Sequence, residues 1–247
     1  MFTPDDRERL RIALVEAARS DRRISGGALT GSAAGGTEDV WSDVDLAFGV
    51  AGSAAIDDVL RDWTGLMYRD HGALHHLDVQ VGNWTYRVFL LVGTLQVDLA
   101  FAPEAEFGPR APTFHLVFGS AVELPRPAAA RAELLLGWGW LYALHARSSI
   151  RRGKHWSAEY MVSGLRDQVL AMACLRHGLP VSEARGIDRL PADVVRPLEA
   201  ALVRVLERDE LRRALGVAMD GLLGEARFFD RDLAERLEPV LQELAAG

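Results

Sequence analysis

Two aspartates one strand step apart are the residues of this sequence best suited to chemistry. Asp43 and Asp45 flank Val44 at the start of an apolar run. Because side chains alternate along a β-strand, both aspartates should lie on one face while Val44, Leu46 and Phe48 point into a core. Two carboxylates this close repel each other unless a cation lies between them, and their hard oxygens suit magnesium. We therefore predict that Asp43 and Asp45 are metal ligands.

A Gly-Ser pair lies upstream of these acids. Gly31 lets a backbone approach a ligand closely, and Ser32 begins what we interpret as a helix N-terminus, which favours anions. A phosphate-binding element on one side and metal-binding carboxylates on the other are the layout of a nucleoside triphosphate site. A solvated acidic strand edge is the alternative, but it does not explain why the acids share strands with strongly apolar residues.

The order Gly31-Ser32, ten residues, Asp43-Val44-Asp45 resembles the signature of the DNA polymerase β-like nucleotidyltransferase superfamily. That family places a third carboxylate on a later strand, and Asp98 matches it here. The pentapeptide Val-Asp-Leu-Ala-Phe occurs at 44–48 and again at 97–101, which we interpret as two neighbouring strands. In both copies the next residue on the Asp face is alanine, which leaves room beside the carboxylates.

The resemblance implies a two-magnesium enzyme with ATP as a substrate. Asp43 and Asp45 would hold the metal that binds the triphosphate, and Asp45 and Asp98 would share the second metal beside the acceptor hydroxyl. Asp98 could also be the general base, and Ser32 would hold a phosphate together with nearby backbone N–H groups. The expected reaction moves AMP from ATP to a hydroxyl of a small molecule, for which an aminoglycoside- or lincosamide-like antibiotic is our first expectation.

Composition limits the other classes of function. The chain has 247 residues, of which 49% are hydrophobic and 26% charged, an ordinary globular composition with a formal net charge of −7. That charge argues against long nucleic acid as the partner. The single cysteine, Cys174, is expected to be a buried small hydrophobe. The charged N-terminus and the lack of a membrane-spanning apolar run predict a cytoplasmic protein without a membrane partner.

Residues 1–124 are expected to form an α/β (α+β) catalytic domain with a mixed, twisted sheet. Leu10, Ala13, Leu14 and Ala17 recur at helical spacing in the first helix. The expected helices are 4–19, a turn or two after 32, and 56–68. The expected strands are 24–30, 43–48, 74–81, 86–92, 95–101 and 114–118, and 103–112 is expected to be a loop.

Residues 125–247 are expected to form an all-α helical bundle, with the domain boundary at Pro125–Pro127. The expected helices are 128–148 and 156–177, followed by two or three further helices within 192–206, 210–223 and 232–245. Bundles of this kind follow the catalytic domain in antibiotic nucleotidyltransferases, and the second half loosely resembles theirs. We expect the bundle to contact the acceptor and close over the nucleotide.

Several bundle residues have candidate roles. Lys154 lies in a basic turn and is predicted to bind phosphate, with an exposed basic loop as the alternative. Glu159 and Asp167 share a polar stripe and are candidates for binding acceptor amines, while Trp156 or Tyr160 offers a flat wall for a sugar ring. Glu159 could also replace Asp98 as the base, or form a structural pair with Arg166.

Three alternatives stay open. His75, His76 and Asp78 could suggest zinc, but ordinary strand histidines are the preferred interpretation. A regulatory, antitoxin-like adenylyltransferase that modifies a protein would use the same site. A non-catalytic nucleotide-binding module is disfavoured by three intact acids. The acceptor, the preferred nucleotide and the oligomeric state cannot be predicted from the sequence.

Overall fold

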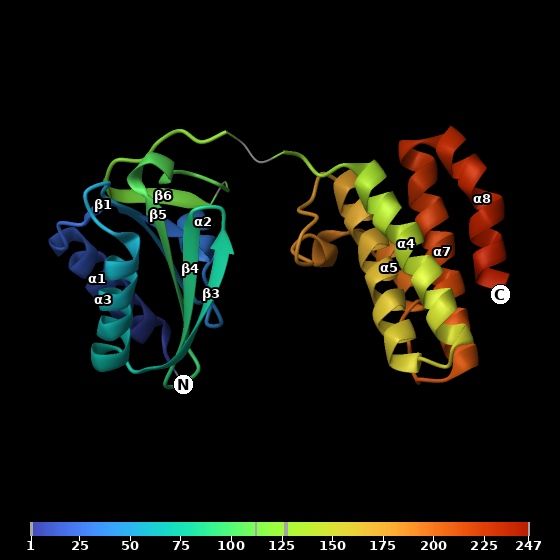
Figure 1. The fold of residues 1–247 in the computed structure, drawn as a ribbon, viewed down its shortest axis with the longest axis horizontal. Helices are drawn as coiled ribbons and strands as arrows, with labels where there is room; N and C mark the ends of the chain where they lie inside the picture. The colour runs from blue at the N-terminus through green and yellow to red at the C-terminus, as the bar shows by residue number, and fades with distance from the viewer. Residues whose placement is uncertain (1, 112, 126–127, 247) are drawn as a thin grey trace. The chain divides into compact units, whose positions relative to one another are not determined.

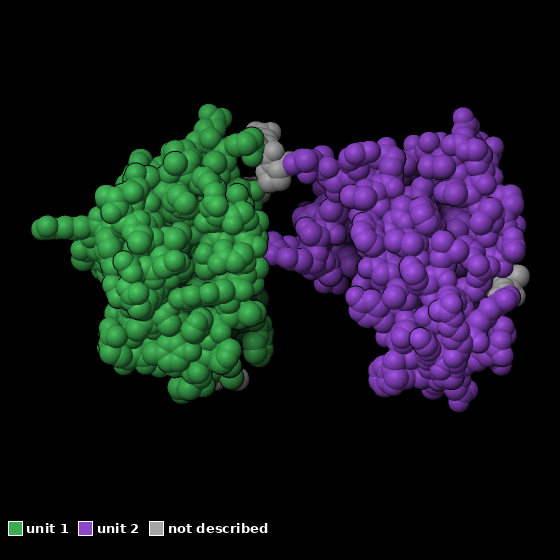
Figure 2. All heavy atoms as spheres, viewed as in Figure 1, with its two compact units in different colours: residues 1–127 green, residues 128–247 purple. Residues whose placement is uncertain are grey.

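The first half of the chain forms a mixed β-sheet with flanking helices. The second half forms a bundle of helices. The computed structural model describes residues 2–111, 113–125 and 128–246. The chain divides into two units, Met1–Pro127 and Ala128–Gly247, each with its own buried core (Figure 2). The expected boundary at Pro125–Pro127 falls partly on residues 126 and 127, which lie outside the described residues. The predicted fold class, an α+β domain followed by an all-α bundle, is confirmed.

Unit 1 contains the elements that the alternating and helical periodicities predict. Thr3 caps the first helix by accepting a hydrogen bond from the backbone N–H of Asp6, with Pro4 at the first helical position. The elements in chain order are α1 (Pro4–Ser20), β1 (Ile24–Thr30), α2 (Gly31–Gly35), β2 (Val44–Val50), α3 (Ile56–Asp70), β3 (Ala73–Val81), β4 (Trp84–Leu91), β5 (Gln96–Pro103), the 3₁₀ turn η1 (Glu104–Glu106) and β6 (Phe114–Gly119).

The six strands form one sheet in the order β3-β4-β5-β2-β1-β6. β2 and β5 pair in parallel at its centre, and the other neighbouring strands pair antiparallel. A parallel pair needs a long crossover, and here α3 and the β3-β4 hairpin supply it. The two central strands are therefore far apart in sequence and adjacent in space.

α1 and α3 cover one face of this sheet (Figure 1). Leu14 of α1 and Trp63 of α3 pack with Leu46, Phe48 and other inward side chains of the central strands, all of them buried. A smaller apolar cluster, which includes Trp84 and Phe107, lies on the opposite face. β2 is thus apolar on both faces except at Asp45, and β5 is apolar except at Gln96 and Asp98.

The buried face of α1 differs from the one predicted. Leu10 and Leu14 are buried as expected, but Ala13 is exposed, and Arg7 and Arg11 are buried in its place. These arginines follow the same i, i+3, i+4 spacing as the leucines. A buried guanidinium needs partners, and those partners turn out to lie in the segment that leads into β2.

Unit 2 consists of helices, as predicted. α4 and α5 are joined by a tight turn in which Gly153 has a φ of +68°, and Gly164 and Gly139 let Tyr142 and Leu222 approach the helix backbones closely. The elements are α4 (Ala132–Arg151), α5 (His155–Arg176), the 3₁₀ turn η2 (Ile187–Arg189), α6 (Ala192–Glu199), α7 (Arg208–Phe229) and α8 (Arg231–Ala246).

Several helix ends in unit 2 differ from the predicted ranges: α7, for example, begins at Arg208 and continues to Phe229, six residues past the expected end at 223. α4 begins four residues later than expected and ends at Arg151. α6 lies within the expected range 192–206 and ends at Glu199, because α7 holds the following segment in another conformation. Arg213 donates hydrogen bonds to the carbonyls of Ala200 and Leu202, and Glu210 accepts one from the backbone N–H of Arg204.

No helix within the described ranges is both long enough and apolar enough to span a bilayer.

Cys174 is buried in the bundle core, and burial raises its pKa. The prediction that Cys174 is a buried small residue is confirmed.

Candidate functional site

The parallel register of β2 and β5 brings two of the predicted site residues together. The two pentapeptide copies align residue by residue, so that Asp45 lies opposite Asp98. Ala47 likewise lies opposite Ala100, one step further along the same face. Both alanines are buried, and their small side chains leave the carboxylates unobstructed on that side. The repeat in the sequence is therefore two neighbouring strands under the same demand, as predicted.

Asp98 is the more perturbed of the two acids. Its Oδ1 is buried and has no hydrogen-bond partner among the described residues. Burial, and in second place the negative charge of Asp43, raises the pKa of Asp98 from its ordinary 3.8 to about 6. A buried carboxylate oxygen without a partner is costly, and such perturbed acids are concentrated at functional sites.

Asp43 lies immediately before β2, which begins at Val44 and not at residue 43 as predicted. Its Oδ2 accepts a hydrogen bond of 3.2 Å from Nε2 of Gln96, two residues before Asp98. Asp43 is also close enough to Asp98 to raise its pKa. The three predicted metal ligands thus lie near the N-terminal ends of the two central strands. They are Asp43, Asp45 and Asp98.

Gly31 contacts the same group of acids through its backbone. A Cβ atom at this position would lie 1.9 Å from Oδ2 of Asp45, and the φ of Gly31 is +57°, in the left-handed region that favours glycine. Both the conformation and the available space therefore require glycine. The Gly-Ser turn is packed directly against the second aspartate.

Ser32 follows in α2, a helix of only five residues. Its Oγ is buried and, within the described part of the chain, makes no hydrogen bond. Ser32 therefore directly follows the glycine that packs against Asp45, in the chain reversal between β1 and β2.

The donor set at these strands is compatible with a divalent cation. Asp45 and Asp98 lie side by side, Asp98 offers an unpartnered carboxylate oxygen, and carboxylates are the ligands that magnesium prefers. In the described ranges, no three His, Cys, Asp or Glu side chains are already placed to hold a metal ion together. Carboxylate rotation would have to accompany binding by Asp43, Asp45 and Asp98.

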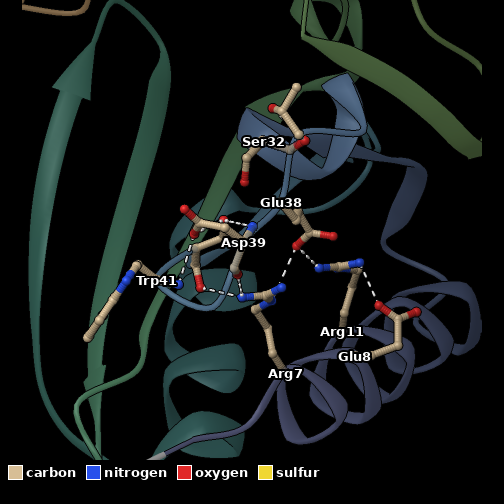
Figure 3. Close-up of polar contacts among 9 residues, drawn as sticks. Arg7, Glu8, Arg11, Ser32, Glu38, Asp39 and Trp41 are labelled. Atoms are coloured by element: carbon tan, nitrogen blue, oxygen red, sulfur yellow. Dashed lines mark hydrogen bonds and ion pairs between the residues drawn. The ribbon is translucent and has the colours of Figure 1, made fainter. Parts of the chain in front are cut away.

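A charged network that the sequence analysis missed fixes the segment between α2 and β2. Nη1 of Arg7 donates to the carbonyl oxygens of Asp39 (2.6 Å) and Ser42 (3.0 Å), and Arg7 and Arg11 both pair with Glu38 (Figure 3). Only 7% of Arg7 is exposed. Since Ser42 precedes Asp43, this network sets the backbone from which the first aspartate projects. The helical spacing of Arg7 and Arg11 with Leu10 and Leu14 was the available signal.

The predicted bundle residues lie in unit 2. Lys154 is exposed at the N-cap of α5, where its side chain makes no capping hydrogen bond. Glu159 is half-buried on α5, and its Oε1 accepts a hydrogen bond of 2.7 Å from Oγ of Ser163. Arg166 pairs with Asp167, with 3.4 Å between Nη2 and Oδ1.

The strand histidines have ordinary roles. Nδ1 of His76 lies 3.0 Å from the hydroxyl of Tyr68. Arg87 forms a bidentate salt bridge with Asp78, in which Nε and Nη2 each lie 2.6 Å from a carboxylate oxygen. This arrangement favours the structural interpretation of the His-His-x-Asp segment over a zinc site.

The solved structures that are similar to this chain include the following two. One is an aminoglycoside 6-adenyltransferase from Bacillus subtilis, with 13% identity over 96% of this chain and 97% of that one, at a TM-score of 0.42. The other is a nucleotidyltransferase-like protein from Exiguobacterium sibiricum 255-15, with 14% identity over 94% of this chain and 80% of that one, at a TM-score of 0.39. No family model and no curated protein sequence matches the chain.

The raised pKa of Asp98 predicts a pH-dependent stability difference. The native state binds the Asp98 proton more tightly than the unfolded chain does, so wild-type stability falls as pH rises from about 4 through about 6. Asp98→Asn removes this loss. Without divalent metal, the variant should match the wild type in Tm near pH 4 and exceed it at pH 8, by thermal unfolding followed by circular dichroism.

Asp78→Asn is the matched control, because Arg87 holds the pKa of Asp78 below its ordinary value. The same change of charge should lower Tm at pH 8, and this deficit should shrink as pH falls through the lowered pKa of Asp78. An Asp98→Asn protein no more stable than the wild type at pH 8 would contradict the assignment of Asp98 as a buried, unpartnered acid.

Proposed function

We propose that this protein is a nucleotidyltransferase that moves AMP from ATP to a hydroxyl group of a small molecule. The observation that carries the proposal is the pairing of Asp45 with Asp98 on adjacent parallel strands, with an unpartnered Asp98 oxygen and with Gly31 packed against Asp45. An aminoglycoside- or lincosamide-like antibiotic remains the acceptor that we propose first. An acidic chain with a net charge of −7 suits a cationic acceptor.

In this reaction the acceptor oxygen attacks the α-phosphorus of ATP. The bond between that phosphorus and the oxygen bridging to the β-phosphate breaks, pyrophosphate leaves, and the hydroxyl proton passes to a base. Asp98 is our candidate for that base, since its carboxylate is unpartnered and its pKa of about 6 is closer to neutrality than that of an ordinary aspartate. The hydroxyl of Ser32 would donate a hydrogen bond to a phosphate oxygen.

Magnesium, for which Asp43, Asp45 and Asp98 would supply the ligands, neutralises triphosphate charge and lowers the pKa of a hydroxyl when bound at such a site. A positive charge would also relieve the repulsion between Asp43 and Asp98 and the cost of the buried Asp98 oxygen. We propose two ions, with Asp45 serving both, and Lys154 as a phosphate contact from the bundle.

Pyrophosphate release from magnesium and ATP across a panel of antibiotics tests the proposed function. Asp45→Asn should lower turnover by at least about 100-fold, because an amide cannot replace a metal-binding carboxylate. Asp58→Asn, an exposed residue of α3 outside the site, should leave turnover unchanged. A folded Asp45→Asn protein that keeps turnover within about tenfold of the wild type would contradict the proposal.

Transfer of label from [α-³²P]ATP in a cell lysate distinguishes the class of acceptor. Label in a small molecule supports the proposed function. Label on a protein band would instead favour the protein-modifying alternative.

Glu159→Gln tests which carboxylate is the base. We propose that Glu159, whose Oε1 is held by a hydrogen bond from Ser163, binds an acceptor amine through its carboxylate. Its loss should raise the acceptor KM by about 5- to 100-fold, the range for a charged hydrogen bond, and leave kcat nearly unchanged. Glu133→Gln, an exposed α4 residue, is the control. A fall of kcat by orders of magnitude with little change in KM would identify Glu159 as the base in place of Asp98.

A further inference from the structure

The most exposed aromatic side chain of unit 1 lies two residues before Asp43. Trp41 is 80% exposed, whereas Tyr68, the next most exposed aromatic of that unit, is 39% exposed and contacts His76. Val40, beside Trp41, is 64% exposed and extends the apolar surface. A large apolar side chain held in solvent beside a candidate site suggests a binding contact.

The segment that carries Trp41 is restrained on both sides. Arg7 binds the carbonyls of Asp39 and Ser42, the backbone N–H of Trp41 donates to Oδ1 of Asp39 at 2.9 Å, and the N–H of Asp39 donates to Oγ of Ser42 at 2.9 Å. The backbone at Trp41 is thereby ordered before any ligand arrives, which lowers the entropic cost of binding.

The indole projects away from this network. In Figure 3 the arginines and Glu38 lie on one side of the segment, and the ring of Trp41 extends on the other. The network therefore fixes the backbone of Trp41 and leaves its ring available.

The position of Trp41 relative to the candidate phosphate and metal residues indicates what the ring could bind. Ser32 lies in α2 just before the segment, and Asp43 ends it, so one short loop joins both groups to Trp41. Two residues span at most about 7 Å. The base of a nucleotide lies one nucleoside length from its phosphates. With a phosphate bound near Asp43, the exposed ring of Trp41 is therefore close enough in the chain to be a candidate contact for the base.

We propose that Trp41 stacks on the purine base of ATP and that Arg7 holds it in place for this contact. The inference rests on the proposed function, because it takes the triphosphate to bind at Ser32 and the aspartates. Base stacking on an aromatic side chain contributes to affinity whatever the base. Trp41 would therefore strengthen nucleotide binding without selecting strongly among purines.

Isothermal titration calorimetry with magnesium, using ATP and inorganic tripolyphosphate as separate ligands, tests the proposal on the full chain. Trp41→Ala should weaken ATP binding by about 10-fold or more and leave tripolyphosphate binding unchanged, since that probe has no base. Trp41→Phe should keep most of the ATP affinity. Trp138→Ala, an exposed tryptophan of α4, is the matched control and should bind ATP like the wild type.

The outcomes separate this inference from the proposed function. If the wild type binds both ligands and Trp41→Ala binds ATP equally well, the Trp41 contact is refuted and the nucleotidyltransferase proposal stands. An equal loss of affinity for ATP and tripolyphosphate would refute stacking and assign Trp41 to the structure of the loop. If the wild type binds neither ligand, the proposed function and the stacking inference both fail.

Discussion

The structure of unit 1 depends on the placement of two carboxylates side by side on adjacent central strands. The parallel register of β2 and β5 sets Asp45 opposite Asp98, and like charges in that position destabilise a sheet. Asp98 carries a further cost, because its Oδ1 is buried without a partner in the described residues, and burial together with the negative charge of Asp43 raises its pKa to about 6. Other interactions in unit 1 must offset the free-energy cost of this carboxylate pair. A bound cation would remove the repulsion directly.

Two features offset this cost. One is the packing on the other face of β2 and β5, and the other is the set of contacts in the loop before β2. Leu46, Phe48, Leu99 and Phe101 pack with α1 and α3, which fixes the two strands rigidly enough to hold the acids in register. Arg7, buried on α1, then ties the carbonyl of Ser42 to that core. The helix that stabilises the sheet therefore also sets the backbone at Asp43, so packing and candidate site are coupled through one side chain.

The sequence predicted the features that depend on neighbouring residues and missed those that depend on contacts between distant parts of the chain. β1 has the predicted bounds, Ile24–Thr30, and the repeated pentapeptide correctly indicated neighbouring strands, because side-chain alternation and apolar runs are local properties. The partnership of Arg7 and Arg11 with Glu38 could not be predicted, since it joins residues about 30 positions apart through the folded core. The early end of α6 likewise depends on Arg213 of the next helix, and the contact between Gly31 and Asp45 depends on the packing of a turn against a strand.

Asp98 is a buried acid whose pKa is raised by burial and by the negative charge of Asp43, and we propose that it is ready to receive a cation. The most direct test of this proposal is a carbon-detected NMR titration of the Asp98 carboxyl group, assigned by comparison with Asp98→Asn. We expect a titration midpoint of about 6 without divalent metal, and a clear fall of this midpoint when magnesium is added, because a nearby cation favours the charged form. A midpoint close to 3.8, or one that magnesium leaves unchanged, would contradict it.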